Sequence, residues 1–252
     1  KYRAFTAPEL TDVPVPIAKL PPALEGMTVV QLTDVHVGSF IGESFIDMLV
    51  AATNDTKPDM VVITGDLVDG SVAELGDAVG ALARLQSRFG TFFVTGNHEY
   101  YSGDVAWVAF LERIGVRVLR NTHTAIGDSG ASIDLVGVDD WSGARRSARK
   151  GYDLEAALHG RDPDRASILL AHQPANFDVV ASRGLDLQIS GHTHGGQVFP
   201  MSRLVALRHP YHRGLYRHRD SHLYVSRGCG FWGPPSRIDS PPELVRYALT
   251  RA

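Results

Sequence analysis

The stretch MVVITGD, residues 60–66, combines the two features that organise this sequence: a short apolar run and, directly after it, a residue type that binds metals. The run is rich in Val and Ile, which is typical of a strand buried on both faces. It ends at Gly65 and Asp66, so we expect the carboxylate of Asp66 at the carboxyl end of that strand.

Five further apolar runs resemble this stretch and are also predicted to be buried strands. They occupy residues 27–34, 91–97, 132–140, 167–172 and 186–192. Helical patterns are predicted at residues 43–55, 71–89, 102–115, 152–160 and 174–184. The alternation of strand and helix predicts an α/β fold.

The two ends of the chain complete the predicted fold. Residues 1–26 are rich in proline and are expected to form an extended lead-in that becomes an edge strand, where proline is tolerated. Residues 214–228 resemble a hairpin, and residues 243–250 resemble a closing strand. With 252 residues, 44% of them hydrophobic, the chain can bury a substantial core. We predict one α/β sandwich domain, residues 1–252, with two stacked sheets and the helices outside.

Composition excludes several classes of protein. A formal net charge of −3 gives no global electrostatic reason to expect nucleic acid as a partner. Cys229 is the only cysteine, which excludes an internal disulfide framework and a cysteine-based zinc cluster. No apolar run approaches the ~20 residues that span a bilayer, so we expect a soluble domain. Because the chain begins at Lys1, an upstream leader or anchor is compatible with it.

Metal-ligand residue types follow most of the predicted strands, at the ends where open α/β sheets bind ligands. Each has an ordinary explanation alone: Asp34 can cap a helix, Asn97 can form a turn, and His172 can be a hydrogen-bonded core histidine. Packing does not explain all of them, because burying them unpaired would cost several kcal/mol. We therefore predict a metal centre formed by Asp34, His36, Asp66, Asn97, His172, His192 and His194.

The spacing and number of these residues favour two ions. Side chains two apart in an extended chain point the same way, so Asp34 and His36 present two ligands to one side, as do His192 and His194. Seven ligands are too many for one tetrahedral ion. If one carboxylate bridges, they suit two ions ~3.5–4 Å apart. Imidazole, carboxylate and amide ligands without thiolate suit manganese, iron or zinc.

The motifs D-x-H, G-D-x-x-D, G-N-H-E, a later His and G-H-x-H follow one another from Asp34 to His194. In this order they resemble the calcineurin-like metallophosphoesterase superfamily. The chain is also similar to the bacterial branch of this superfamily, the YkuE- and YaeI-type phosphodiesterases. The stretches that carry this similarity are YSGDVAW, GVDDW, GHTHGGQVFP and LYVSRGCGFWGPPSRI. The resemblance covers nearly the whole chain. It implies a four-layer α/β/β/α sandwich in which helices flank two mixed sheets.

The resemblance also implies a role for each residue of the motifs. Asp34, His36, Asp66 and His194 would hold the first ion, and Asp66, Asn97, His172 and His192 the second, with Asp66 bridging. His98 would protonate the leaving oxygen, and Asp69 would orient His98. Phosphoprotein phosphatases of the superfamily carry an arginine where this chain has Gly70, which disfavours a protein phosphatase.

The predicted activity follows from these roles. Two cations lower the pKa of a bridging water, supply hydroxide at neutral pH and neutralise phosphoryl oxygens. Protonation of the leaving group by His98 is expected to contribute roughly 10²–10⁴-fold. We therefore expect a hydrolase of phosphodiester or pyrophosphate bonds. The alternatives are a phosphomonoesterase of low specificity and, from another class, a non-catalytic scaffold with the same fold.

A basic segment, residues 187–219, contains no Asp or Glu and suggests where the substrate binds. The predicted substrate-binding residues are Arg208, Arg213, Arg217, Arg227 and Trp232, with Arg237 also at the pocket rim. They suit an anionic headgroup, a diphosphate or an acidic membrane surface. A solvated basic loop and purely structural turns are equal alternatives, and the basic run at residues 145–150 has the same two interpretations.

The resemblance also has an implication for the location of the protein, because some relatives carry amino-terminal membrane segments or export signals. We expect a membrane-associated, extracytoplasmic setting and a lipid-linked or nucleotide-linked substrate. A nuclease is disfavoured, because the chain is slightly acidic overall and has one prominent basic segment.

Overall fold

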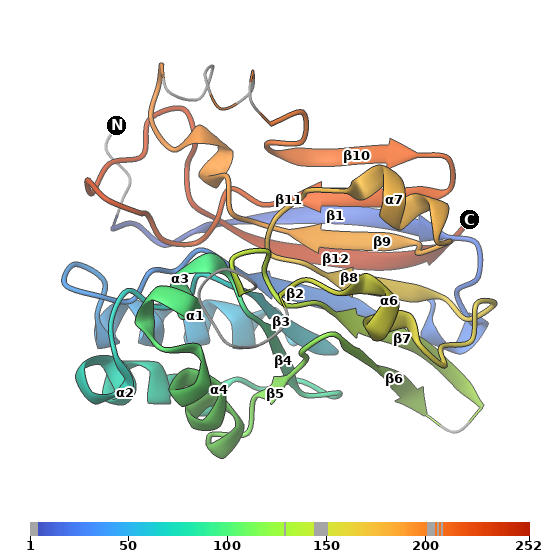
Figure 1. The fold of residues 1–252 in the computed structure, drawn as a ribbon, viewed down its shortest axis with the longest axis horizontal. Helices are drawn as coiled ribbons and strands as arrows, with labels where there is room; N and C mark the ends of the chain where they lie inside the picture. The colour runs from blue at the N-terminus through green and yellow to red at the C-terminus, as the bar shows by residue number, and fades with distance from the viewer. Residues whose placement is uncertain (1–4, 129, 144–150, 201–204, 206, 208) are drawn as a thin grey trace.

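The computed structural model describes residues 5–252 except 129, 144–150, 201–204, 206 and 208. Within them, two mixed sheets lie against each other (Figure 1). The first has the strand order β1 (Glu9–Ile17), β12 (Glu243–Arg251), β2 (Thr28–Leu32), β3 (Met60–Thr64), β4 (Thr91–Val94) and β5 (Arg117–Val118). The second has the order β10 (Gly214–His218), β11 (Ser221–Val225), β9 (Leu187–Ser190), β8 (Ser167–Leu170), β7 (Ala131–Gly137) and β6 (Thr122–Asp128).

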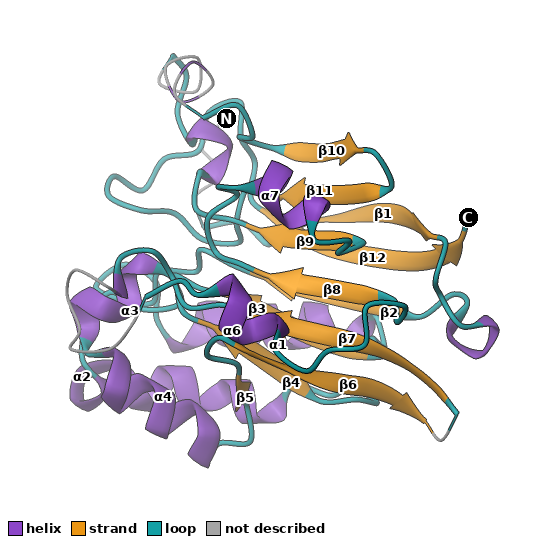
Figure 2. Cartoon of the chain, turned by 45° about the vertical axis from the view of Figure 1, so that its right-hand side comes forward, coloured by secondary structure: helices purple, strands orange, loops and turns teal. Residues whose placement is uncertain are grey.

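Helices cover the outer faces of both sheets (Figure 2). The first sheet carries α1 (Glu43–Asp55), α2 (Val72–Gly80) and α4 (Asp104–Arg113). The second carries α6 (Leu154–Leu158) and α7 (Phe177–Ser182). The short helix α3 (Asn97–Ser102) precedes α4, and short 3-10 turns span Pro22–Leu24, Ala81–Arg84 and His194–Gly196. No helix in the described part of the chain is long and apolar enough to cross a membrane.

Three apolar cores separate these layers, and β3 shows how the sequence produces them. Val61 and Ile63 pack beneath the helices of the first sheet. Met60 and Val62 alternate with them and lie in the core between the two sheets. Because both faces are buried, the strand is a continuous apolar run. The predicted α/β/β/α sandwich is confirmed.

The proline-rich lead-in forms an edge strand, as predicted. β1 pairs in parallel with β12 at the edge of the first sheet, with Glu9 opposite Glu243. Val13, Val15 and Ile17 point into the core between the sheets. The intervening prolines lack a backbone N–H. They are tolerated because no strand in the described part of the chain pairs on their other side.

Three local predictions differ from the structure. The helix predicted at 71–89 ends at Gly80 and continues only as a 3-10 turn, because Gly76 and Gly80 are weak helix formers and Leu82 turns into the core. The helix predicted at 102–115 is interrupted at Gly103, which has a left-handed φ of 98° and is the N-cap residue of α4. β6 was not predicted, because Ile126 is its only fully buried apolar residue and leaves no apolar run.

Candidate metal centre

The two sheets meet where their central parallel strands end. β2, β3 and β4 run parallel in the first sheet, as do β8 and β9 in the second. Across the junction, Nδ1 of His172 lies 2.8 Å from the carbonyl oxygen of Thr64. The backbone N–H of His192 donates to the Asp34 carboxylate at 3.0 Å. The loops after β2, β3, β8 and β9 therefore share one buried region.

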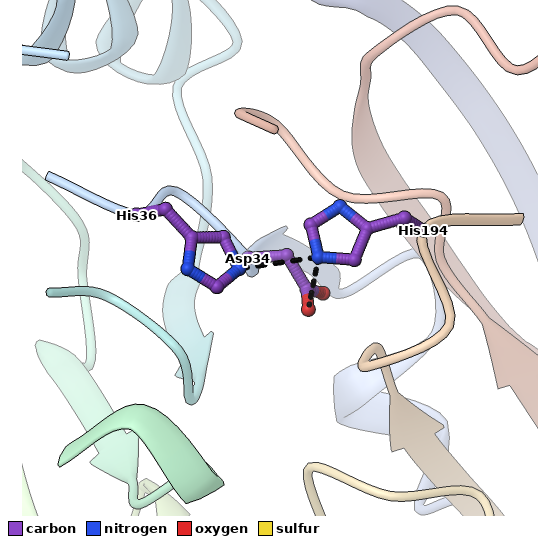
Figure 3. A group of neighbouring side chains, drawn as sticks. All are labelled: Asp34, His36 and His194. Carbon is purple, nitrogen blue, oxygen red and sulfur yellow. Dashed lines mark hydrogen bonds and ion pairs between the residues drawn. The ribbon is translucent and has the colours of Figure 1, made fainter. Parts of the chain in front are cut away.

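Asp34, His36 and His194 form the first ligand group (Figure 3). The Nε2 atoms of His36 and His194 are 3.1 Å apart. Nε2 of His194 is 3.4 Å from Oδ1 of Asp34. Ligand atoms bonded to one ion at ~2.0–2.2 Å lie roughly 3–3.5 Å apart, so these distances fit a shared cation.

Asp66, His172 and His192 form the second ligand group. Nε2 of His172 is 3.1 Å from Oδ2 of Asp66 and 3.2 Å from Nδ1 of His192. Oδ1 of Asn97, at the start of α3, is buried and has no hydrogen-bond partner among the residues that the structure describes. An unpaired buried oxygen of this kind costs about 1–3 kcal/mol, which coordination to a cation would remove.

Asp66 lies between the two groups. Its Oδ2 is 3.1 Å from Nε2 of His172 and 3.9 Å from Nε2 of His36. Burial raises the pKa of Asp66, but the charge and hydrogen bond of His172 lower it more, so the net shift is downward. The carboxylate is therefore held ionised, the form that binds a cation.

The backbone conformation of the predicted ligands is unusual. Five of them have φ in the left-handed region, which non-glycine residues rarely adopt. These are Asp34 (φ 52°), His36 (55°), Asp66 (50°), His192 (72°) and His194 (51°). Such conformations cost of order 1–3 kcal/mol each and concentrate at functional sites. The chain bends sharply at these residues, which lets consecutive loops turn their side chains toward one region.

Two glycines of the motifs permit this close packing. A Cβ at Gly191 would overlap the Asp34 carboxylate and the Thr33 hydroxyl. A Cβ at Gly96 would overlap the carboxylate and backbone nitrogen of Asp66. Both glycines are needed because one ligand-bearing loop passes directly over another.

His98 and Asp69 lie beside the ligand groups and contact each other. Nδ1 of His98 is 2.5 Å from Oδ1 of Asp69, which also lies 3.1 Å from Nδ1 of His36. Burial raises the pKa of Asp69, but the hydrogen bonds from His36 and His98 lower it more, to about 2. Burial lowers the pKa of His98, but Asp69 and the charge of Asp66 raise it more.

Glu99 also supports the site, although it was not among the predicted site residues. Its carboxylate accepts backbone N–H groups of Gly96 (2.6 Å), Asp66 (3.0 Å) and Leu67 (2.8 Å). It thereby ties together the loops after β3 and β4. Burial and the charge of Asp66 raise the pKa of Glu99 to about 7. Its place three residues after the N-cap Gly96, as in a capping box, was the available signal.

Arg237 had two equal interpretations, a place at the pocket rim and a structural role in a turn, and the structure supports the structural role. The side chain is 1% exposed and donates to the carbonyl oxygens of Gly230 (2.8 Å) and Arg227 (2.6 Å). Its Nη2 is 3.1 Å from Nδ1 of His194. Burial and the charge of Arg237 hold the pKa of His194 well below its ordinary value. His194 is therefore neutral, as a metal-binding imidazole must be.

The structure separates the predicted substrate-binding residues. Arg213 passes close to Gly195, and the Trp232 ring lies 6.1 Å from the His98 ring. Arg227 is instead engaged by Glu243 at 2.8 Å. Arg217 pairs with His222, which in turn pairs with the first residue of β9, so Arg217 lies at the end of the sheet away from His192. Arg208 and the basic run at 145–150 lie outside the described residues.

These features define an α/β-sandwich protein with a candidate metal centre where the strands of its two sheets end. A family model described as Calcineurin-like phosphoesterase matches residues 27–196. The chain therefore belongs to the calcineurin-like phosphoesterase family, which comprises metal-binding hydrolases of phosphoric esters. The resemblance predicted from the motifs is confirmed.

Similar proteins extend beyond the matched residues. "Transmembrane protein with metallophosphoesterase domain" from Bos taurus is 41% identical over 260 residues, which cover 99% of this chain and 59% of that protein. The uncharacterized metallophosphoesterase YkuE of Bacillus subtilis is 27% identical, over 96% of this chain and 85% of that protein. The chain thus spans 59% of the length of the first curated relatives that it matches.

A solved structure supports the fold. Phosphopantetheinyl hydrolase (PptH) from Mycobacterium tuberculosis superposes with a TM-score of 0.51 over 88% of this chain and 95% of that chain. The two sequences are 13% identical, so the likeness concerns the fold alone.

Proposed function

We propose that this chain is a phosphodiesterase that uses two metal ions bridged by Asp66. The observation that carries the proposal is the position of the Asp66 carboxylate, 3.1 Å from a nitrogen of one ligand group and 3.9 Å from a nitrogen of the other. A carboxylate placed between two groups of imidazole ligands is the arrangement that a dinuclear centre requires.

The donor set fits this proposal. The first ion would be held by Asp34, His36, Asp66 and His194, and the second by Asp66, Asn97, His172 and His192. The buried Cys229 thiol donates to the carbonyl oxygen of Glu243 at 3.2 Å and belongs to neither ligand group. Nitrogen and oxygen donors without thiolate suit manganese, iron or zinc. When bound, such ions would supply a hydroxide nucleophile near neutral pH and neutralise the phosphoryl charge.

The chain's own residues complete the chemistry. Nε2 of His98 faces Asp66 at 3.9 Å, while Nδ1 is held by Asp69. In this orientation a protonated His98 can donate from Nε2 to the leaving oxygen of a phosphate ester. Asp69 fixes the ring and favours its protonated form.

A membrane setting and a lipid-linked or nucleotide-linked substrate belong to this proposal as well. The name of the Bos taurus relative describes a transmembrane protein. That relative and this chain match along nearly all of this chain, which supports the same setting. The scaffold alternative is disfavoured, because the chain retains all seven predicted ligands together with His98.

Metal content and hydrolysis measured on the same samples test the proposal. Purified protein should contain close to two transition-metal ions, and chelation should abolish hydrolysis of bis(4-nitrophenyl) phosphate. The Asp66→Ala variant should lose both ions, and the His36→Ala variant should lose mainly one. The control variant Asp77→Ala, which changes an exposed aspartate of α2, should keep both ions. Full activity after chelation, or normal metal content in Asp66→Ala, would contradict the proposal.

A further inference from the structure

A cavity of about 400 Å³ opens beside His192, a proposed ligand of the second ion. One wall comes from the segment between β8 and α7 and from the start of α7, including Pro174, Asn176 and Phe177. The other wall comes from residues 209–211, which are distant in sequence. Residues 209–211 belong to the basic segment, residues 187–219, whereas the wall before α7 had no predicted role. His192 connects the cavity to the proposed metal centre.

The walls of this cavity are fixed and largely apolar. The Tyr211 ring meets the buried Phe177 ring edge to face at 5.6 Å, and its hydroxyl donates to Asp178 at 3.1 Å. The His209 ring lies 6.4 Å from the His192 ring. Tyr211 is thus held at its ring and at its hydroxyl, which preorganises a flat wall close to the centre.

A second cavity, of about 420 Å³, lies on the other side of the site and differs in chemistry. It is lined by His98 and by polar side chains that include Asp69, Ser71 and Glu74. Since His98 is the proposed proton donor, the leaving group belongs on this side. The other arm of a diester, which stays on phosphorus, then has the cavity beside His192 available to it.

We propose that the cavity beside His192 binds the retained arm of a phosphodiester, and that this arm carries a flat heteroaromatic ring of the nucleobase type. This inference rests on the proposed function. The volume is in the range of small-ligand sites. His209 and Tyr211 offer rings for stacking, and the Asn176 amide offers a donor and an acceptor to the ring edge.

Two other occupants fit the cavity less well. An acyl chain would cover the Asn176 amide without hydrogen-bonding it, which disfavours a lipid tail. A second phosphate would need cationic partners, and the described lining residues include no Lys or Arg. A flat polar heterocycle uses both the rings and the Asn176 amide.

Two diesters with the same leaving group test the inference. Thymidine 5′-(4-nitrophenyl phosphate) and methyl 4-nitrophenyl phosphate differ only in the retained arm. The wild-type kcat/KM should be ~10-fold or more higher for the thymidine diester, because stacking contributes about that factor. Tyr211→Leu and His209→Ala should remove most of this preference through KM, with unchanged metal content and unchanged hydrolysis of the methyl diester. His159→Ala, at an exposed histidine after α6, is the matched control.

Product binding separates this inference from the proposed function. Calorimetry on metal-loaded protein should show thymidine 5′-phosphate binding ~10-fold more tightly than methyl phosphate, with the difference lost in Tyr211→Leu. Equal affinities, or a preference that survives both substitutions, would overturn the cavity assignment even if both diesters are hydrolysed. Tyr211-dependent binding without hydrolysis of either diester would support the cavity and contradict the hydrolase.

Discussion

His98 has two ring nitrogens with different surroundings. Nδ1 contacts Asp69 at 2.5 Å, and Nε2 faces the Asp66 carboxylate at 3.9 Å. The Tyr101 ring, 5.1 Å away, packs against the imidazole edge. The side chain is therefore oriented toward the ligand groups without belonging to the predicted ligand set, as a proton donor requires.

Replacing His98 by alanine should reduce kcat according to the leaving group. A nitrophenolate departs readily without a proton, whereas an alkoxide does not. We expect a small loss on nitrophenyl diesters and a loss of roughly 10²–10⁴-fold on alkyl diesters, with near-normal metal content. Steady-state kinetics over a leaving-group series measure this difference. An equal loss across the series, with both metals bound, would instead assign His98 to binding phosphoryl oxygens.

Asp69→Asn should show the same dependence on the leaving group more weakly, and it should also weaken metal binding. The second effect is expected because Oδ1 of Asp69 contacts Nδ1 of His36 at 3.1 Å as well as His98. Loss of such a supporting carboxylate typically costs 10–100-fold in metal affinity. A metal titration with a competing chelator measures it. Unchanged affinity would show that His36 does not depend on Asp69 for its orientation.

The sequence indicated the ligands better than the residues that support them. A residue of a metal-binding type that directly follows a predicted strand can be recognised from the sequence. This pattern identified Asp34, His36, His192 and His194. Arg237 donates hydrogen bonds to backbone carbonyl oxygens, and Glu99 accepts hydrogen bonds from backbone N–H groups. Which backbone atoms they reach depends on how separate loops pack, and no local pattern encodes that.

At the level of elements, the junctions between strands and loops set the geometry of the centre. Gly191 follows β9 and lies against the Asp34 carboxylate, so even a methyl group would displace one of them. Gly191→Ala should therefore lower the affinity of the first ion strongly while the sheets still form. Metal content and far-UV circular dichroism, measured together, test this. Normal metal binding in the variant would show that the loops are not tightly packed.

Gly80→Ala is a matched control for that substitution. Gly80 ends α2 with helical dihedral angles, and a Cβ there would meet the Phe110 ring only at 4.0 Å. The change should leave metal binding intact and raise the free energy of unfolding by ~0.5–1 kcal/mol. Urea denaturation is the measurement. Lost metal binding in this variant would indicate that glycine substitutions act through general destabilisation.

Strands with two buried faces were predicted well, because apolar runs of four or five residues identify them. β6 was missed because it is an edge strand whose residues are mostly partly exposed. Helix lengths were overestimated where glycines interrupt an apolar pattern. The cavity beside His192 was invisible for another reason: its walls are about 30 residues apart in sequence and meet only in the folded chain.

On the scale of the whole molecule, the proposed ligands join the two sheets. Asp34, Asp66 and Asn97 follow strands of the first sheet, and the three histidines from 172 onward follow strands of the second. Bound ions should therefore stabilise the sandwich. At a free metal concentration 100 times Kd, the expected gain is about 2.7 kcal/mol for one site.

Chelation should accordingly lower the Tm of the wild-type protein, and adding back the metal should restore it. Asp66→Ala should show little further change on chelation, because its sites are already weakened. Differential scanning calorimetry with parallel metal analysis measures both effects. A wild-type Tm that stays constant while the metals are removed would show that the ions do not link the sheets.

The central claim is a pair of ions bridged by Asp66, and anomalous diffraction from crystals grown with manganese tests it most directly. The account predicts two anomalous peaks ~3.5–4 Å apart, with the Asp66 carboxylate between them. It also predicts that His36 and His194 contact one peak and His172 and His192 the other. A single peak, or two peaks that do not share Asp66, would contradict it.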